Sequence, residues 1–125
     1  MTGTKFEDVF DWLWTPEQLA EVADWVPVVT MDDGGGYDWQ TFHGWYSPTA
    51  RRYFWGSGAG CSCNDFTEEY RTVSDFESGD RPALMAALRR FAEESYGFGP
   101  TALVDALMAA NGFNPRATQG SGDPS

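Results

Sequence analysis

The residues of this chain whose types best suit chemistry are Cys61, Cys63 and the single histidine, His43. With Asp65 as a fourth ligand they could form the tetrahedral site that zinc prefers. Structural zinc sites ordinarily use two pairs of closely spaced ligands, and only the cysteine pair is present here, so plain structural thiols without a cofactor are favoured. Zinc, a redox disulfide, and a cysteine nucleophile with His43 as its base stay open as alternatives.

The cysteines follow a glycine-rich run, Gly-Ser-Gly-Ala-Gly at residues 56–60. A phosphate-binding loop aims backbone N–H groups and a helix N-terminus at the anion, and in the nucleotide-hydrolase version a lysine follows. Here the run is followed by no lysine, and Asp65, Glu68 and Glu69 would repel an anion. We therefore expect a glycine-bearing strand that another backbone or an aromatic ring approaches closely.

An acidic turn and a set of aromatic side chains supply the candidate binding residues. Calcium would accept carboxylates, but the turn lacks the alternating carboxylates and the distal glutamate of an EF-hand loop, so a charged hairpin turn is favoured. The candidate binding residues are Asp32, Asp33, Asp38, Trp39, Trp45, Tyr53 and Trp55. In a second hypothesis, the four aromatic residues of this set line a pocket for a nucleotide-like ligand.

The charge of the chain narrows the class of partner. It has 125 residues, with 19 acidic against 8 basic side chains and a net charge of −11. Residues 1–50 carry nine of the acids and a single base, Lys5. Such a field repels nucleic-acid backbones and anionic membranes alike, so direct binding to either is not expected. Without a signal-like segment or a long apolar run, the chain is expected in the cytoplasm, with reduced cysteines.

Hydrophobic periodicity predicts one α+β domain over residues 1–113, followed by a disordered tail over 114–125. Apolar residues at helical spacing over 4–14, and the Thr-Pro-Glu-Gln start at 15–18, predict a helical elbow at about 4–24. Three to four antiparallel strands are expected within about 26–76, with a hairpin turn at 47–50. Two helices follow at about 80–95 and 100–111, the second burying Leu103, Val104, Leu107 and Met108.

The alternation within residues 37–46 divides the second strand into two faces. Trp39, Thr41, His43 and Trp45 share one face, and Phe42 and Tyr46 lie on the other. We expect the elbow and both C-terminal helices to pack on one apolar face of the sheet. The opposite face would then expose tryptophan or tyrosine side chains, and contiguous exposed aromatic surface usually marks a contact site.

The stretch over about residues 45–70 resembles a group of small uncharacterised proteins from phages of actinobacteria. An aromatic strand in these proteins runs into a Gly-Cys-Ser-Cys segment and then into an acidic, aromatic stretch. The residues that carry the resemblance are Tyr53, Trp55, Gly58, Gly60, Cys61, Ser62, Cys63 and Phe66. The resemblance implies a phage origin and synthesis in the cytoplasm of an infected host cell.

These observations favour a non-enzymatic binding protein. Small acidic phage proteins commonly occupy a basic surface of a host enzyme, sometimes by imitating the charge of DNA. The expected partner is therefore a host or phage protein, engaged through the acidic, aromatic N-terminal half. The alternatives are the metal- or thiol-dependent site at Cys61, Cys63 and His43, and the aromatic pocket for a nucleotide-like ligand.

Overall fold

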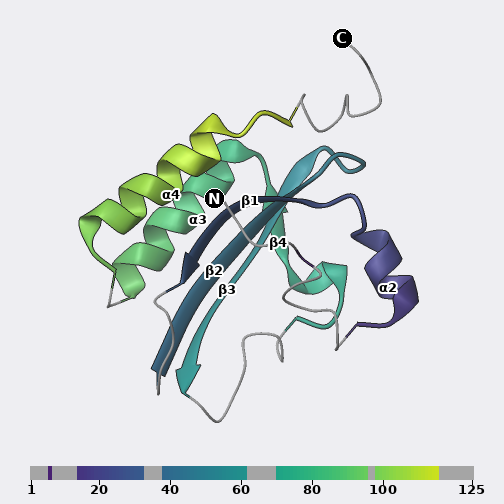
Figure 1. Cartoon of the computed structure of the whole chain (residues 1–125), viewed down its shortest axis with the longest axis horizontal. Coiled ribbons are helices and arrows are strands. Elements are labelled where there is room, and N and C mark those ends of the chain that lie inside the picture. Colours follow the sequence, from purple (N-terminus) through teal and green to yellow (C-terminus); the bar gives the residue numbers. More distant parts are fainter. Residues whose placement is uncertain (1–5, 7–13, 33–37, 62–69, 96–97, 116–125) are drawn as a thin grey trace.

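The computed structural model describes residues 6, 14–32, 38–61, 70–95 and 98–115, and these form the α+β fold predicted from the sequence (Figure 1). The elements are α2 (Pro16–Glu21), β1 (Val26–Asp32), β2 (Asp38–Ser47), β3 (Arg52–Cys61), a 3₁₀ turn (Val73–Asp75), β4 (Glu77–Gly79), α3 (Arg81–Glu94) and α4 (Pro100–Gly112). The four strands form one antiparallel sheet in the order β1-β2-β3-β4. Among the described residues, β1 and β4 are therefore the outer strands.

The hairpin between β2 and β3 fixes the register of the two central strands. Ser47 pairs with Arg52, so the turn spans residues 48–51, one residue later than the sequence indicates. Arg51 has a φ of 58°, which places it in the left-handed region, and its N–H donates to the Ser47 carbonyl at 2.7 Å. Thr49 donates from both its N–H and its hydroxyl to the Asp24 carboxylate, tying this turn to the chain just before β1.

Between β3 and α3 the described chain forms a 3₁₀ turn and a short fourth strand, which lies just beyond the range of about 26–76 expected for the strands. The 3₁₀ turn at Val73–Asp75 comes first, and the Asp75 carboxylate accepts the backbone N–H groups of Arg71 and Thr72. These hydrogen bonds lower the pKa of the Asp75 carboxyl. The short strand β4 then pairs with residues 53–55 of β3.

Helix α3 packs on one face of the sheet as its apolar stripe predicts. Asp80 caps the helix by accepting the Ala83 N–H at 3.1 Å, and the predicted stripe of Leu84, Leu88 and Phe91 is buried. The strand residues on this face are buried against α3 and α4: Val28, Val29, Met31, Phe42, Tyr46, Tyr53 and Trp55. We call this the helix-side core.

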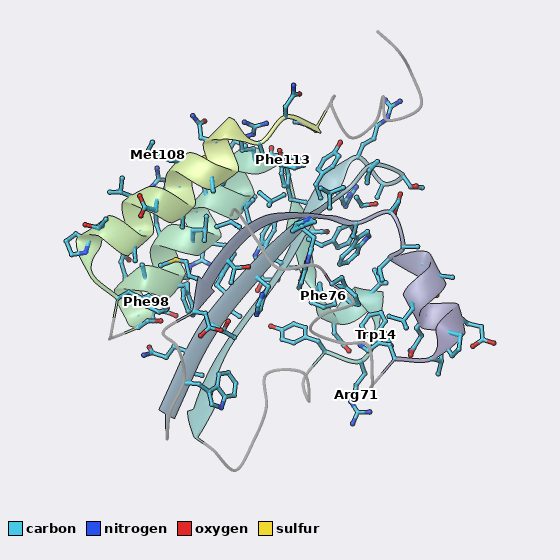
Figure 2. All side chains as sticks on the ribbon, in the orientation of Figure 1. Trp14, Arg71, Phe76, Phe98, Met108 and Phe113 are labelled. Atoms are coloured by element: carbon cyan, nitrogen blue, oxygen red, sulfur yellow. The ribbon has the colours of Figure 1, made fainter. Side chains whose placement is uncertain are left out.

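Helix α4 is rotated relative to the sequence prediction. Its buried residues are Ala106 and Ala110, whereas Val104 and Met108 are 51 % and 67 % exposed. The prediction that Val104 and Met108 are buried is therefore wrong, and Figure 2 shows Met108 on the outer side of the helix. The helix contacts both α3 and β1, and its alanines let its backbone approach these neighbours closely, so the longer side chains at 104 and 108 point outward.

The opposite face of the sheet is covered by the N-terminal segment rather than exposed. Its buried residues are Phe6, Trp14, Val22, Trp25, Trp45 and Phe76, which we call the aromatic-side core. The expectation that all helices pack on one face is wrong, because α2 lies on this second face while α3 and α4 lie on the first (Figure 1). Large aromatic side chains lie on both faces of the sheet, so both faces need apolar cover. The segment around α2 covers one face, and α3 and α4 cover the other.

Two hydrogen bonds fasten the segment around α2 to the chain between β3 and β4. The Trp14 indole donates to the Tyr70 carbonyl at 3.0 Å, and the Gln18 amide donates to the Arg71 carbonyl at 3.0 Å. Thr15 and Gln18 form the predicted capping box at the start of α2. Figure 2 places Trp14 and Phe76 on the α2 side of the sheet.

Other predictions fall outside the described residues. The first helix of the elbow lies in that part, apart from Phe6 and Trp14, and so do residues 116–125 of the predicted tail. None of the described helices has the length and apolar character needed to cross a membrane.

Candidate functional site

The glycine-rich run forms part of β3, as the strand prediction has it, and an aromatic ring does lie against it. A Cβ atom built on Gly56 would come within 2.8 Å of the Tyr70 ring. The Tyr70 hydroxyl donates to the Ser57 carbonyl at 2.9 Å and accepts the Ser57 N–H at 3.0 Å. Gly56 is therefore the place where the sheet makes room for Tyr70.

Three polar side chains of β1 and β2 form a row on the aromatic side of the sheet. The Thr41 hydroxyl lies 3.3 Å from Oδ2 of Asp32 and 3.1 Å from Nε2 of His43. Asp32 pairs with Thr41 across the two strands, and Thr41 and His43 are two residues apart on β2, so strand geometry alone brings the three together. The His43 ring also stacks on Trp45, with centroids 5.7 Å apart.

The surroundings of His43 favour its neutral form. Burial lowers the pKa of His43 to about 4, and the nearby Asp32 carboxylate offsets part of that effect. The imidazole is therefore uncharged at neutral pH, and because the Thr41 hydroxyl donates its one proton to Asp32, that hydroxyl accepts a hydrogen bond from the Nε2–H of His43.

Thr41 and His43 have the atoms of a hydroxyl nucleophile and its base. Their exposed fractions are only 5 % and 7 %, so a substrate would not reach the hydroxyl in this arrangement. The row joins the end of β1 to β2 and satisfies polar groups beneath the aromatic cover. Its role in the fold is structural.

The residues of the metal hypothesis are not all brought together. His43 pairs with Gly56, whereas Cys61 pairs with Asp38, five residues further along β3. That separation is about 17 Å along a strand, which exceeds the reach of two side chains to one metal ion. His43 therefore does not lie beside Cys61.

The remaining metal candidates stay predictions. Cys63, Asp65 and the Cys61 side chain lie outside the described residues. Within the part of the chain that the structure describes, no three His, Cys, Asp or Glu side chains are grouped as metal ligands.

The four candidate aromatic residues are divided between the two faces. Trp45 and the half-buried Trp39 belong to the aromatic-side core, while Tyr53 and Trp55 belong to the helix-side core. Trp45, Tyr53 and Trp55 are 0 %, 4 % and 5 % exposed. They therefore line neither one common pocket nor an exposed aromatic surface, because the sheet separates them and cover exists on both sides.

The candidate acids are placed as follows. Asp32 is exposed at the end of β1, and Asp38 begins β2 with its backbone paired to Cys61. Asp33 and the Asp38 side chain lie outside the described residues.

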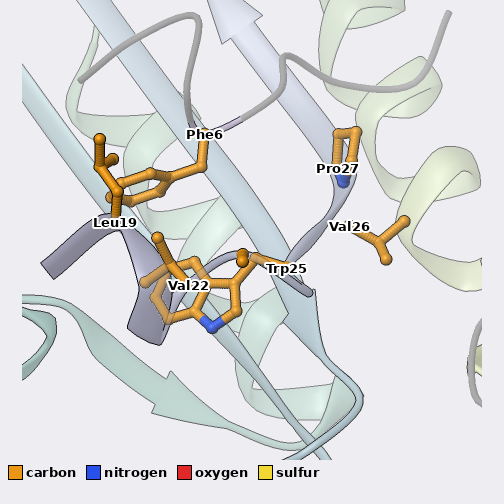
Figure 3. Close-up of a pocket in the computed structure, with 7 residues that line it drawn as sticks. Phe6, Leu19, Val22, Trp25, Val26 and Pro27 are labelled. Atoms are coloured by element: carbon orange, nitrogen blue, oxygen red, sulfur yellow. The ribbon is translucent and has the colours of Figure 1, made fainter. Parts of the chain in front are cut away.

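An apolar pocket that sequence reasoning missed opens between α2 and the start of β1. It has a volume of about 420 Å³ and is lined by Phe6, Leu19, Val22, Ala23, Trp25, Val26 and Pro27 (Figure 3). We call it the α2/β1 pocket. The sequence carried a signal for it, since Trp25 lies between a short helix and a β-branched run, where a large ring packs at the junction of two elements.

The helix beside this pocket is acidic on its exposed surface. Glu17 and Glu21 are exposed, as are Ala20 and Ala23, and no basic residue occurs in α2. Leu19 of α2 and Val22, the residue that caps its C-terminus, line the pocket. An apolar recess and a set of exposed carboxylates therefore lie on neighbouring sides of one short helix.

Fold and pocket together define a small α+β domain with one antiparallel sheet covered on both faces and an apolar recess beside an acidic helix. A family model described as a domain of unknown function (DUF7574) matches residues 20–110, and the chain belongs to this family. The matched range includes the whole sheet, α3 and most of α4, but only the last two residues of α2. Neither the curated proteins nor the solved structures contain a match to this chain.

Proposed function

We propose that this chain is a non-enzymatic binding protein that engages a basic protein surface through the α2/β1 pocket and the carboxylates of α2. The observation that carries the proposal is the pocket itself, an apolar recess of about 420 Å³ in the acidic N-terminal half of the chain. A phage origin, action in the host cytoplasm and a host or phage protein as partner are parts of the same proposal, supported by the Gly-Cys-Ser-Cys resemblance.

The pocket supports an anchoring role by its lining. Phe6, Val22 and Trp25 are buried at its base, and Leu19 and Val26 are half-buried at its sides. Transferring one leucine-sized side chain from water into such a lining contributes about 1.5–3 kcal/mol, or roughly ten- to hundredfold in affinity. A single apolar side chain of the partner would thus provide much of the binding energy of a small contact.

The charge of the N-terminal half supports the choice of partner. Exposed carboxylates at Glu17 and Glu21 stand on the helix that forms one wall of the pocket. With a net charge of −11, the chain attracts cationic surfaces over a distance of about 10 Å at moderate salt. Complementary potentials speed encounter and disfavour acidic competitors.

A matched pair of variants tests the proposal by affinity capture from a lysate of an actinobacterial host. Ala23→Glu places a charge at the exposed edge of the pocket, just after α2, whereas Ala20→Glu places the same charge on α2, outside the lining. We expect the wild type and Ala20→Glu to retain one common host protein and Ala23→Glu to lose it. Circular dichroism of both variants confirms that the fold is intact.

The captured protein must then bind the wild type as a purified pair, with affinity that falls as salt rises. If both variants retained the host protein equally, the contact would lie elsewhere on the chain, and the proposed role of the pocket would be wrong. Failure of all three baits to retain any protein above a bead control would contradict the binding function.

A further inference from the structure

We infer that a second recess, between α4 and β1, is a binding site for an arginine side chain of the partner. This recess, the α4/β1 groove, has a volume of about 230 Å³. It is lined by Val29, Thr30, Met31, Asp32, Phe98, Ala102, Asp105, Ala106 and Ala109. The inference rests on the proposed function in one respect, because a protein partner supplies the arginine.

The groove has apolar walls of the kind that hold an aliphatic stem. Met31 and Ala106 are buried, at 3 % and 4 % exposed, and form its inner surface. Ala102 and Ala109 are small and half-buried, so the helix backbone leaves room beside the strand. An arginine buries its three methylene groups along such a surface while its charged end stays near water.

The charge of the groove selects a cation. Asp105 on α4 and Asp32 at the end of β1 are both exposed, and no basic residue is among the described residues that line the groove. The Thr41 hydroxyl donates to Oδ2 of Asp32, so this carboxylate is held on the aromatic side of the sheet, at the edge of the groove rather than inside it. Asp105 is therefore the direct acceptor for a ligand, and Asp32 adds to the negative potential.

The aromatic ring in the lining favours arginine over lysine. Phe98 packs on Phe91 with ring centroids 5.6 Å apart and remains half-buried at the groove. Figure 2 shows Phe98 at the end of the helix pair where α4 begins. A planar guanidinium can stack on such a ring while its donors reach a carboxylate, whereas an ammonium group is a compact, strongly hydrated charge.

The test uses N-acetyl-arginine amide as the probe and N-acetyl-citrulline amide as its uncharged counterpart of nearly equal shape. Both are titrated into the ¹⁵N-labelled full chain and followed by NMR. We expect the arginine probe to shift, saturably, the amide signals of Met31, Ala102, Ala106 and Ala109. The citrulline probe should bind more weakly, by up to about fivefold, because an exposed charge pair contributes up to about a factor of five.

Asp105→Asn is the matched variant, and Glu93→Gln on α3 removes an exposed carboxylate that does not line the groove. Asp105→Asn should weaken the arginine probe about fivefold and Glu93→Gln should leave it unchanged. Equal binding of both probes would show an apolar site and overturn the inference. It would equally be overturned if the groove signals moved with protein concentration alone, which would indicate a second copy as occupant, or if they failed to move at all.

This outcome is independent of the test of the proposed function. The probe binds without the natural partner, and the capture experiment changes only residues 20 and 23, which do not line the groove. A silent groove with normal capture refutes the arginine site alone. A responsive groove with no captured protein refutes the proposed partner and leaves the arginine site standing as a ligand site.

Discussion

Lowering the pH should destabilise this domain through one side chain, His43. Its pKa falls from 6.5 to about 4 on folding, chiefly because burial disfavours the charged imidazole. Between these two values the unfolded chain binds a proton that the folded chain does not, so stability falls as the pH drops below 6.5 and levels off below about 4. At about 1.4 kcal/mol per pH unit, the full loss amounts to about 3 kcal/mol, of which about 2 kcal/mol falls between pH 7 and pH 5.

The measurement is urea unfolding at pH 7 and pH 5 for the wild type and for His43→Gln. Glutamine does not titrate, and its amide can keep a hydrogen bond with Thr41. His43 is the only histidine of the chain, and the pKa of the Asp75 carboxyl is lowered, which keeps that group out of this window. We expect the wild type to lose about 2 kcal/mol between the two pH values and the variant to lose much less.

The reasoning is refuted if His43→Gln loses as much stability between pH 7 and pH 5 as the wild type does. A direct check is the NMR titration of the His43 ring in the folded protein, which should show a midpoint near 4. A midpoint near 6.5 would mean that the ring is solvated and that the packing around it differs from the structure.

Four further substitutions test the packing of the sheet and of α4 by urea unfolding. Gly56→Ala should cost about 1–3 kcal/mol, because its Cβ would lie 2.8 Å from the Tyr70 ring; unchanged stability would show that the ring moves freely. Gly112 lies at the end of α4 with open space around it, so Gly112→Ala should instead raise the free energy of unfolding by up to about 1 kcal/mol. A lower free energy of unfolding would show that the added methyl group meets other atoms. Met108→Glu should stay within about 0.5 kcal/mol of wild type, while Ala106→Glu should cost several times more; the reverse order would restore the orientation of α4 that the sequence suggests.

The local features of the fold were predictable from sequence because each depends on residues close together along the chain. The capping box at Thr15, the cap at Asp80 and the stripe of α3 all follow from spacing within a few residues. The alternation of β2 also predicts correctly which of its side chains share a face. Such patterns need no knowledge of what packs on the element.

The features that depend on distant partners were not predictable. The apolar residues of α4 lie all around the helix, so its pattern does not choose between burying Val104 with Met108 and burying Ala106 with Ala110; contact with α3 and β1 decides it. Aromatic residues occur on both faces of β2. Their pattern therefore does not show which face is covered by the N-terminal segment and which by α3 and α4.

In the candidate sites, too, contacts within one strand were predictable and contacts between elements were not. The neighbourhood of Thr41 and His43 follows from one strand, but the addition of Asp32 needs the β1–β2 register. The pairing of Cys61 with His43 looked possible from residue types alone, and the β2–β3 register separates them. The α2/β1 pocket is lined mostly by one stretch, residues 19–27, whereas the α4/β1 groove forms where β1 meets residues 98–109, so no single stretch of sequence indicates the groove.

The central claim, that the α2/β1 pocket anchors a partner protein, is tested most directly by calorimetric titration with the purified partner. We predict that Ala23→Glu weakens the affinity at least about tenfold, as expected for loss of one apolar anchor, while Ala20→Glu stays within about twofold of the wild type. Equal affinities for the wild type and Ala23→Glu, with the fold of the variant intact, would contradict the claim.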